Sequence, residues 1–261
     1  MTIFLSDTPG KRNLPSPKRT INQCVMKLLL ISNSTNAGEE YLRYPLPEIG
    51  RFLQGVREVV FIPYAAVTFS YTAYEQRVQA RFAELGIRVR SIHHAVDQRK
   101  VIRRAEAICV GGGNTFALAK KMHEQGLMRE ILLKLRTGTP YVGWSAGSNV
   151  CCPTIATTND MPIVTPASMR AIHAVPFQIN PHYLDANPDG HAGETREQRL
   201  LEYIEANPLR WVVGLREGCM LRYENDRLEL IGNRPMRIFR KGVEPYELHP
   251  GDDLSFLLKR D

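Results

Sequence analysis

The sequence predicts an α/β fold with a mostly parallel sheet and helices on both of its faces. A chain of 261 residues, 43% of them hydrophobic, can bury one large core or two small ones, and we expect one. Short apolar runs alternate with helical patterns, which is typical of parallel, helix-covered sheets. The stretch 140–149 is an apolar strand that ends in Gly-x-Ser-x-Gly and continues into small residues suited to a helix start.

The chain divides at residue 26 into two unequal parts. Residues 1–25 are rich in Pro, Ser, Thr and Lys/Arg and show neither helical nor strand periodicity, so we expect a disordered N-terminal extension. Met26 also stands where a compact α/β domain would naturally begin, and the sequence does not separate an extension from a misassigned start. Residues 26–261 are expected to form a single α/β domain.

The first half of this domain predicts four strands with helices between them. Apolar residues recur at helical spacing on one face of a predicted helix that contains Tyr74, Val78, Phe82 and Leu85. The predicted strands are 27–32, 58–62, 88–92 and 107–110, with a short helix at 101–105 before the last of them.

The second half continues the alternation and then changes character. Thr195 to Gln198 form a capping box that opens a helix expected to bury Leu200, Leu201 and Ile204. The last forty residues contain three turn signals and predict antiparallel strands. The remaining predicted elements are helices at 116–125 and 127–136 and strands at 140–144, 177–182 and 211–215.

Charge and composition argue against several classes of partner. The formal net charge is +7, but the first 25 residues contribute +3, and the basic residues of the remainder are spread among acids, so a nucleic-acid groove is not expected. No apolar run is long enough to cross a bilayer, and residues 1–25 lack the apolar core of a secretory signal. We therefore expect a cytoplasmic protein without a membrane partner.

The cysteines predict neither disulfides nor a metal site. Their number is odd, and Cys151 and Cys152 are adjacent, which suits neither a bridge to one another nor a Cys-x-x-Cys zinc site. Reduced thiols and no bound metal are expected.

Ser145 is the candidate nucleophile. A sharp strand-to-helix turn needs strained backbone angles at the serine and small neighbours, which Gly143, Ala146 and Gly147 supply. The helix that follows directs backbone N–H groups at negative charge that forms beside the serine. Ala146 is therefore a candidate oxyanion donor.

A second candidate for oxyanion binding is the glycine loop after strand 107–110. It is neither a dinucleotide fingerprint nor a phosphate-binding loop, because its spacing differs and no lysine follows the glycines. Three successive glycines allow close approach of the backbone to a ligand, so Gly112 and Gly113 are expected to donate N–H groups opposite Ala146. A plain tight turn is the alternative.

His182 is the candidate general base. It lies at the end of strand 177–182, which would bring it to the same rim of the sheet as Ser145. The imidazole needs an acid to orient it. We favour Glu217, which follows strand 211–215, over Asp160, which lies in the loop 157–162.

These residues lie within a chain that resembles the peptidase E family of α-aspartyl dipeptidases from Met26 to Gly218. The extension before Met26 has no counterpart in that family, and the segment after Gly218 matches loosely. The matching motifs are LISNST at 30–35, VGGGNTF at 110–116, GWSAG at 143–147, PTI at 153–155, TTNDMPIV at 157–164, QINPH at 178–182 and GETREQR at 193–199.

The resemblance implies a serine peptidase with a class I glutamine amidotransferase-like fold that cuts dipeptides with an N-terminal aspartate. The family's triad falls on Ser145, His182 and Glu217, and Asp160 also matches a family position, so it stays a candidate catalytic residue. No metal or other cofactor is required, and a monomer or homodimer is expected.

Substrate recognition is expected to involve a cation. Arg196 is the leading candidate for the substrate's aspartyl carboxylate, because a guanidinium and a helix N-terminus both favour an anion. Asn114 is a further candidate substrate-binding residue. Two rival functions remain: a β-aspartyl, cyanophycinase-like exopeptidase with the same triad, and a non-catalytic binding domain of the same fold.

Overall fold

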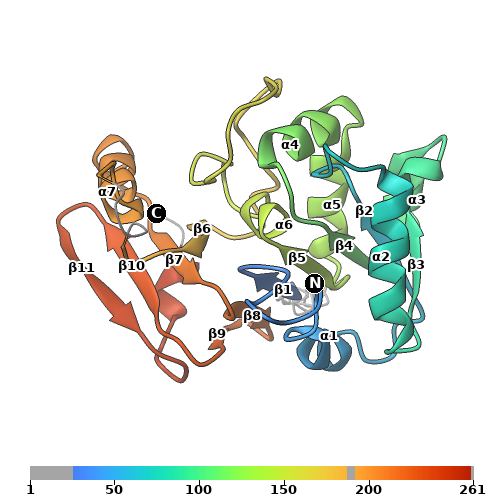
Figure 1. Cartoon of the computed structure of the whole chain (residues 1–261), viewed down its shortest axis with the longest axis horizontal. Coiled ribbons are helices and arrows are strands. Elements are labelled where there is room, and N and C mark those ends of the chain that lie inside the picture. Colours follow the sequence, from blue (N-terminus) through green and yellow to red (C-terminus); the bar gives the residue numbers. More distant parts are fainter. Residues whose placement is uncertain (1–25, 187–191, 260–261) are drawn as a thin grey trace, which may run out of the picture.

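The computed structural model describes residues 26–186 and 192–259, which form two β-sheets with helices around the larger one (Figure 1). The predicted disordered extension, 1–25, lies outside the described residues. The larger sheet has seven strands in the order β3-β2-β4-β5-β1-β8-β9, of which the first five are parallel. Its strands are β1 (Leu28–Ile31), β2 (Glu58–Ile62), β3 (Arg88–Ser91), β4 (Ala107–Val110), β5 (Tyr141–Trp144), β8 (Met220–Glu224) and β9 (Arg227–Ile231).

The smaller sheet has four strands in the order β11-β10-β7-β6 and lies on the left in Figure 1. Strands β6 and β7 pair in parallel, whereas β10 and β11 are antiparallel. The predicted α/β class, with a mostly parallel sheet and antiparallel C-terminal strands, is confirmed, but the sequence did not reveal that β6 and β7 leave the main sheet. The strands are β6 (Gln178–Tyr183), β7 (Val212–Arg216), β10 (Met236–Arg240) and β11 (Val243–Leu248).

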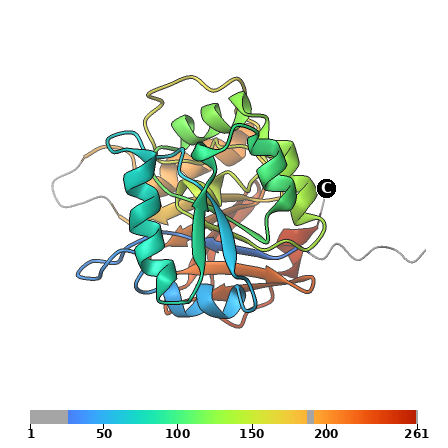
Figure 2. The same cartoon turned by 90° about the vertical axis from the view of Figure 1, so that its right-hand side faces the viewer.

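Helices cover both faces of the main sheet, as Figure 2 shows with α2 and α5 on opposite sides of the strands. Apolar residues of α1 and α2 pack on one face, and those of α3, α4 and α5 on the other. Within the described ranges no helix combines the length and apolar character needed to cross a membrane. The helices are α1 (Leu46–Phe52), α2 (Tyr71–Ala83), α3 (Gln98–Arg104), α4 (Thr115–Glu124), α5 (Leu127–Leu135), α6 (Ala146–Asn149) and α7 (Arg196–Ala206), with 3₁₀ turns η1 (Ile92–His94) and η2 (Ser255–Leu258).

Helix α7 begins at the predicted capping box. The Thr195 hydroxyl accepts a hydrogen bond from Gln198 N, and the Gln198 side chain accepts one from Thr195 N. Leu200 and Ile204 are buried as predicted, but Leu201 is 36% exposed, so its predicted burial is wrong. Successive side chains of an α-helix are rotated by about 100° around its axis. Leu201 therefore points away from the buried stripe that contains Leu200.

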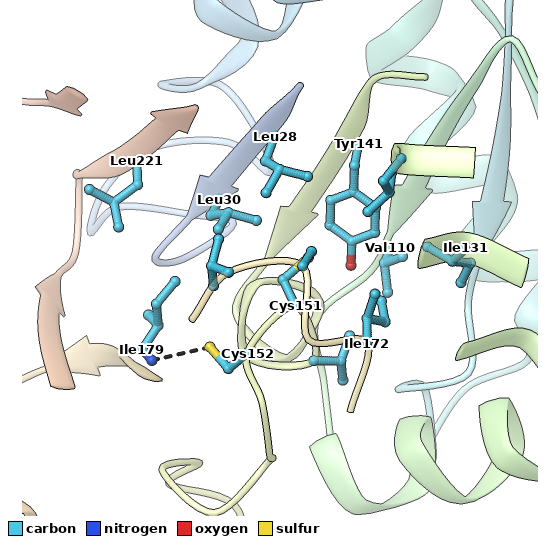
Figure 3. Packing of buried hydrophobic residues seen from close by; sticks show 14 of the residues in the cluster. Leu28, Leu30, Val110, Ile131, Tyr141, Cys151, Cys152, Ile172, Ile179 and Leu221 are labelled. Atoms are coloured by element: carbon cyan, nitrogen blue, oxygen red, sulfur yellow. Dashed lines mark hydrogen bonds between the residues drawn. The ribbon is translucent and has the colours of Figure 1, made fainter. Parts of the chain in front are cut away.

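One continuous apolar core joins the two sheets. It contains Leu28 and Leu30 of β1 together with Ile179 of β6 and Leu215 of β7. Figure 3 shows Ile179 beside Cys152, whose sulfur accepts a hydrogen bond from Ile179 N at 3.2 Å. The smaller sheet is therefore held at a fixed place beside β1, and this placement brings its residues to the end of β5.

Candidate active site

Ser145 lies in a sharp turn between β5 and α6. Its backbone angles, φ 54° and ψ −114°, are strained for a residue with a side chain. An added Cβ at Gly143 would lie 2.5 Å from Gly147 O, and one at Gly147 would lie 2.1 Å from Val110 O. The turn therefore requires glycine on both sides of Ser145, because the backbone segments touch there.

Ser145, His182 and Glu217 form a chain of hydrogen bonds. His182 Nε2 lies 3.0 Å from Ser145 Oγ, and His182 Nδ1 lies 2.6 Å from Glu217 Oε1. His182 has a φ of 53° and sits where the β6–β7 register shifts, one residue before β6 ends. The side chains of His182 and Glu217 are 38% and 42% exposed, so the chain of hydrogen bonds lies open to a ligand.

Two polar residues directly after β1 hold this arrangement in place. The buried Ser32 hydroxyl accepts a hydrogen bond from His182 N at 2.9 Å and donates one to Leu215 O at 2.7 Å. The Asn33 side-chain oxygen accepts a hydrogen bond at 2.9 Å from the backbone N–H of Gly218, the residue after Glu217. Sequence reasoning missed both roles, although both residues lie in the motif 30–35.

The glycine loop after β4 reaches the nucleophile. An added Cβ at Gly112 would lie 2.9 Å from Ser145 Cβ, so the backbone touches the serine there. Gly113 has a φ of 132°, and an added Cβ would lie 2.3 Å from Ala65 O. Within residues 26–186 and 192–259, the N–H groups of Gly112, Gly113 and Ala146 have no protein acceptor, so they are available to a ligand.

The carboxylate of Asp160 lies at the start of α4 rather than on His182. It accepts hydrogen bonds from Thr115 N at 2.7 Å, from Thr115 Oγ1 at 2.5 Å and from Thr158 Oγ1 at 3.0 Å. A carboxylate in this position is favoured by the helix N-terminus. Of the two acids that the sequence left open, Glu217 is therefore the one in contact with the imidazole.

Asn114 is the N-cap of α4, and both of its side-chain groups are already bonded. Its oxygen accepts a hydrogen bond from Ala117 N at 3.0 Å, and its nitrogen donates one to Met161 O at 2.9 Å. Each group keeps one further hydrogen-bonding position, a second N–H on the nitrogen and a second lone pair on the oxygen. The structure thus gives Asn114 a clear role in fixing the loop next to Gly113.

Arg196 is the first residue of α7, and its guanidinium forms no ion pair with any residue that the structure describes. Burial and the nearby charge of Arg199 lower the pKa of Arg196, and Asp160 opposes this effect. Arg199 differs, because it pairs with Glu194 at 3.6 Å. Arg196 is therefore a half-buried cation without an anionic partner among the residues that the structure describes.

An ion-pair network around the buried Arg216 lies directly before Glu217 in the chain. Arg216, only 5% exposed, binds both oxygens of Asp185 and both oxygens of Glu247. Hydrogen bonds from Arg216 lower the pKa of each of these carboxyl groups. The network ties the end of β7 to β11 and to the segment after β6, and nothing in the sequence pattern predicted it.

Potential metal ligands gather elsewhere in the described part of the chain. Glu75, His93 and His94 offer three ligand atoms within 4.8 Å of one another. In the structure Glu75 accepts a hydrogen bond from Ser91 N and pairs with His94 at 2.7 Å. None of the predicted site residues belongs to this group.

The arrangement as a whole is that of hydrolases with a serine nucleophile: a serine in a strained turn, a histidine within reach, a carboxylate behind it and free N–H groups beside it. Residues 28–231 match the model of peptidase family S51. The chain belongs to this family, and the resemblance inferred from the sequence motifs is confirmed.

Curated relatives support the same assignment over nearly their whole length. Peptidase E of Nostoc sp. (strain PCC 7120) is 51% identical over 90% of this chain and 97% of its own. Peptidase E of Streptomyces coelicolor is 47% identical over 89% and 95%, and that of Shigella flexneri 45% identical over 87% and 99%. These similarities support peptidase activity.

Solved structures share the fold at lower identity. A putative peptidase E protein from Listeria monocytogenes superposes with a TM-score of 0.60 at 21% identity, covering 80% of this chain and all of its own. A peptidase from an acI-B1 actinobacterium gives 0.66 at 18% identity, covering 89% and 97%. Both similarities concern the fold alone.

Proposed function

We propose that this peptidase is a serine-type dipeptidase that hydrolyses Asp-Xaa dipeptides through an acyl-enzyme on Ser145. The observation that carries the proposal is the hydrogen-bond chain from Ser145 through His182 to Glu217. The distances of 3.0 and 2.6 Å are those that a nucleophile, its base and the orienting acid require.

In the acylation step, Ser145 Oγ attacks the carbonyl carbon of the substrate's aspartate while His182 Nε2 takes the serine proton. Glu217 accepts the Nδ1–H bond, which fixes the tautomer and stabilises the imidazolium. His182 then gives the proton to the leaving amine, and the C–N bond breaks. Water, activated by the same imidazole, hydrolyses the ester and restores Ser145.

The tetrahedral intermediate carries a negative oxygen that needs hydrogen-bond donors. The N–H groups of Gly113 and Ala146 flank Ser145 without a protein acceptor in the described ranges, and Gly112 supplies the close backbone contact. Donors fixed in advance stabilise the developing charge more than they stabilise the neutral carbonyl. We therefore assign Gly113 and Ala146 as oxyanion donors and Gly112 as the residue that brings the loop close to Ser145.

Preference for aspartate is assigned to Arg196. Its guanidinium is half-buried, lacks an ion-pair partner within the described residues and lies in the electrostatic range of Asp160. A substrate carboxylate would pair with it at the N-terminus of α7. A dipeptide with an uncharged first residue in place of aspartate leaves the half-buried Arg196 guanidinium unpaired. Its affinity and its turnover rate should therefore be lower.

The first experiment compares hydrolysis of α-linked and β-linked Asp-Leu by the wild type and by Ser145→Ala, with product analysis. We expect α-linked cleavage and a loss on the order of a millionfold in Ser145→Ala. Glu217→Gln should lower the turnover rate roughly a thousandfold or more. Asp160→Asn tests the other candidate acid in the same assay. Preferential β-linked cleavage would establish the β-aspartyl alternative, and a wild type that binds without turnover would establish a binding domain.

The second experiment tests the source of specificity with two arginines of the same helix. Arg196→Met should lower kcat/KM for Asp-Leu about ten- to a hundredfold more than for Ala-Leu, because one charge-assisted hydrogen bond is lost. Arg199→Met is the matched control, since Arg199 is exposed and paired with Glu194. An equal loss for both substrates in Arg196→Met would make Arg196 structural.

A further inference from the structure

A buried tyrosine lies beneath the glycine loop and contacts both segments that carry the proposed oxyanion donors. Tyr74 of α2 is 3% exposed, and its hydroxyl donates a hydrogen bond to Gly112 O at 2.9 Å. The same oxygen accepts one from Trp144 Nε1 at 3.1 Å. Trp144 directly precedes Ser145, so one hydroxyl bridges the glycine loop and the nucleophile turn. From its spacing in the sequence, Tyr74 was predictable only as part of the apolar face of its helix.

The phenol is fixed as a donor toward the loop. Burial raises the pKa of Tyr74, so the hydroxyl keeps its proton at neutral pH. Its other contacts come from donors, Trp144 Nε1 and, at 3.3 Å, the hydroxyl of Tyr41. The single phenol proton is therefore directed at the Gly112 carbonyl.

Holding this carbonyl also fixes the next N–H group. In a planar trans peptide the C=O and the N–H point in opposite directions, so the Gly113 N–H points away from Tyr74. Tyr74 and Trp144 belong to the core on the α1–α2 face of the sheet, whereas Ala146 belongs to the core on the other face, which also contains β6 residues. The Gly113 N–H therefore points away from the α1–α2 side of the sheet, to which Tyr74 belongs.

The loop has little freedom to adopt another peptide orientation. An added Cβ at Gly111 would lie 2.6 Å from the Tyr74 hydroxyl, so the backbone rests directly on the phenol. Gly111 N donates to Ile62 O at 3.1 Å and Asn114 N to Ala65 O at 2.9 Å, which anchors both ends of the loop. Between these anchors, the bond from Tyr74 orients the middle peptide.

We propose that Tyr74 is a positioning residue that orients the Gly112–Gly113 peptide and couples it to the Ser145 turn, so that the two oxyanion donors converge. This inference rests on the proposed function. It assigns Tyr74 no contact with the substrate. Its effect should therefore appear in the transition state and not in ground-state binding.

The test replaces Tyr74 by phenylalanine, which keeps the ring and removes the hydroxyl. Loss of a whole oxyanion donor costs about a hundred- to a thousandfold in kcat, and a donor that is present but loosely oriented should cost less, about ten- to a hundredfold. KM for Asp-Leu should stay within about twofold of the wild type. Tyr64→Phe is the control, because Tyr64 is 1% exposed and its hydroxyl bonds to Gln98 at 2.8 Å rather than to the loop.

A second readout separates positioning from general destabilisation. The boronic acid analogue of aspartate forms a tetrahedral adduct with a nucleophilic serine and places an oxygen where the oxyanion develops. In Tyr74→Phe its inhibition constant should rise by about the same factor as kcat falls, while the affinity for free L-aspartate stays unchanged. In Tyr64→Phe neither value should move, although both variants should melt at lower temperature.

The proposal is overturned if folded Tyr74→Phe matches Tyr64→Phe in kcat and in boronate affinity. Should Tyr74→Phe not fold, Tyr41→Phe, which removes one donor to the Tyr74 oxygen, should lower kcat about two- to tenfold with unchanged KM, and an unchanged kcat there would count against the proposal. A wild type without turnover of Asp-Leu would instead contradict the proposed function.

Discussion

Replacing Ser32 by alanine should damage both stability and turnover, although Ser32 does not touch the substrate in the proposed mechanism. Its buried hydroxyl is the acceptor for His182 N and the donor to Leu215 O. Alanine leaves these two backbone groups of the smaller sheet without that partner, at the contact between β1 and the β6–β7 pair. His182 has a φ of 53°, so its strained backbone loses a bond that holds it in place.

The magnitude follows from the number of groups left unpaired. One buried donor or acceptor costs about 1–3 kcal/mol, so the two groups at Ser32 together should lower the free energy of unfolding by about 3 kcal/mol. For a chain of this size that corresponds to about 6–12 °C in Tm. Without the Ser32 hydroxyl, we expect the backbone of His182 to shift by about 1 Å. A misplacement of this size costs on the order of a hundredfold in rate, so we expect kcat to fall by about that factor.

The assay measures Tm by calorimetry and kcat for Asp-Leu at a temperature where the variant is folded. Ser91→Ala is the matched control, because Ser91 is also a buried serine at the end of a strand, but its hydroxyl bonds to His93 Nδ1 at 2.6 Å. It should lower Tm with an unchanged kcat. If Ser32→Ala keeps wild-type kcat, or if both variants lose the same activity, the assigned role of Ser32 is refuted.

Two further predictions concern stability. Because Arg216 lowers the pKa of Asp185 and Glu247 in the folded protein, the stabilisation is present above about pH 5 and is lost as the pH falls toward about 3. Tm measured across this range should therefore fall less steeply in Arg216→Met, and parallel curves would contradict the assignment. Leu200→Ala should cost about 2–5 kcal/mol in urea unfolding, but Leu201→Ala under about 1 kcal/mol, since Leu200 is 4% and Leu201 36% exposed; equal losses would contradict the burial pattern.

The sequence alone predicted those features that depend on neighbouring residues. The strands β1, β2, β4 and β5 are short apolar runs. The capping box of α7 consists of four consecutive residues and can be recognised in the sequence. The turn at Ser145 was predictable because strained angles demand small neighbours close in sequence, and Gly143 and Gly147 flank it. Local rules of this kind act within a few residues and leave a readable pattern.

The tertiary structure alone decided which distant groups meet. The sequence left Glu217 and Asp160 as rival acids, and only the packing of the smaller sheet against β1 puts Glu217 on His182 while Asp160 binds the start of α4. The positions of Ser32 and Tyr74 under the site have the same origin. Their hydrogen-bond partners are 33 to 183 residues away, and a single hydroxyl in the sequence gives no pattern that identifies a partner so distant.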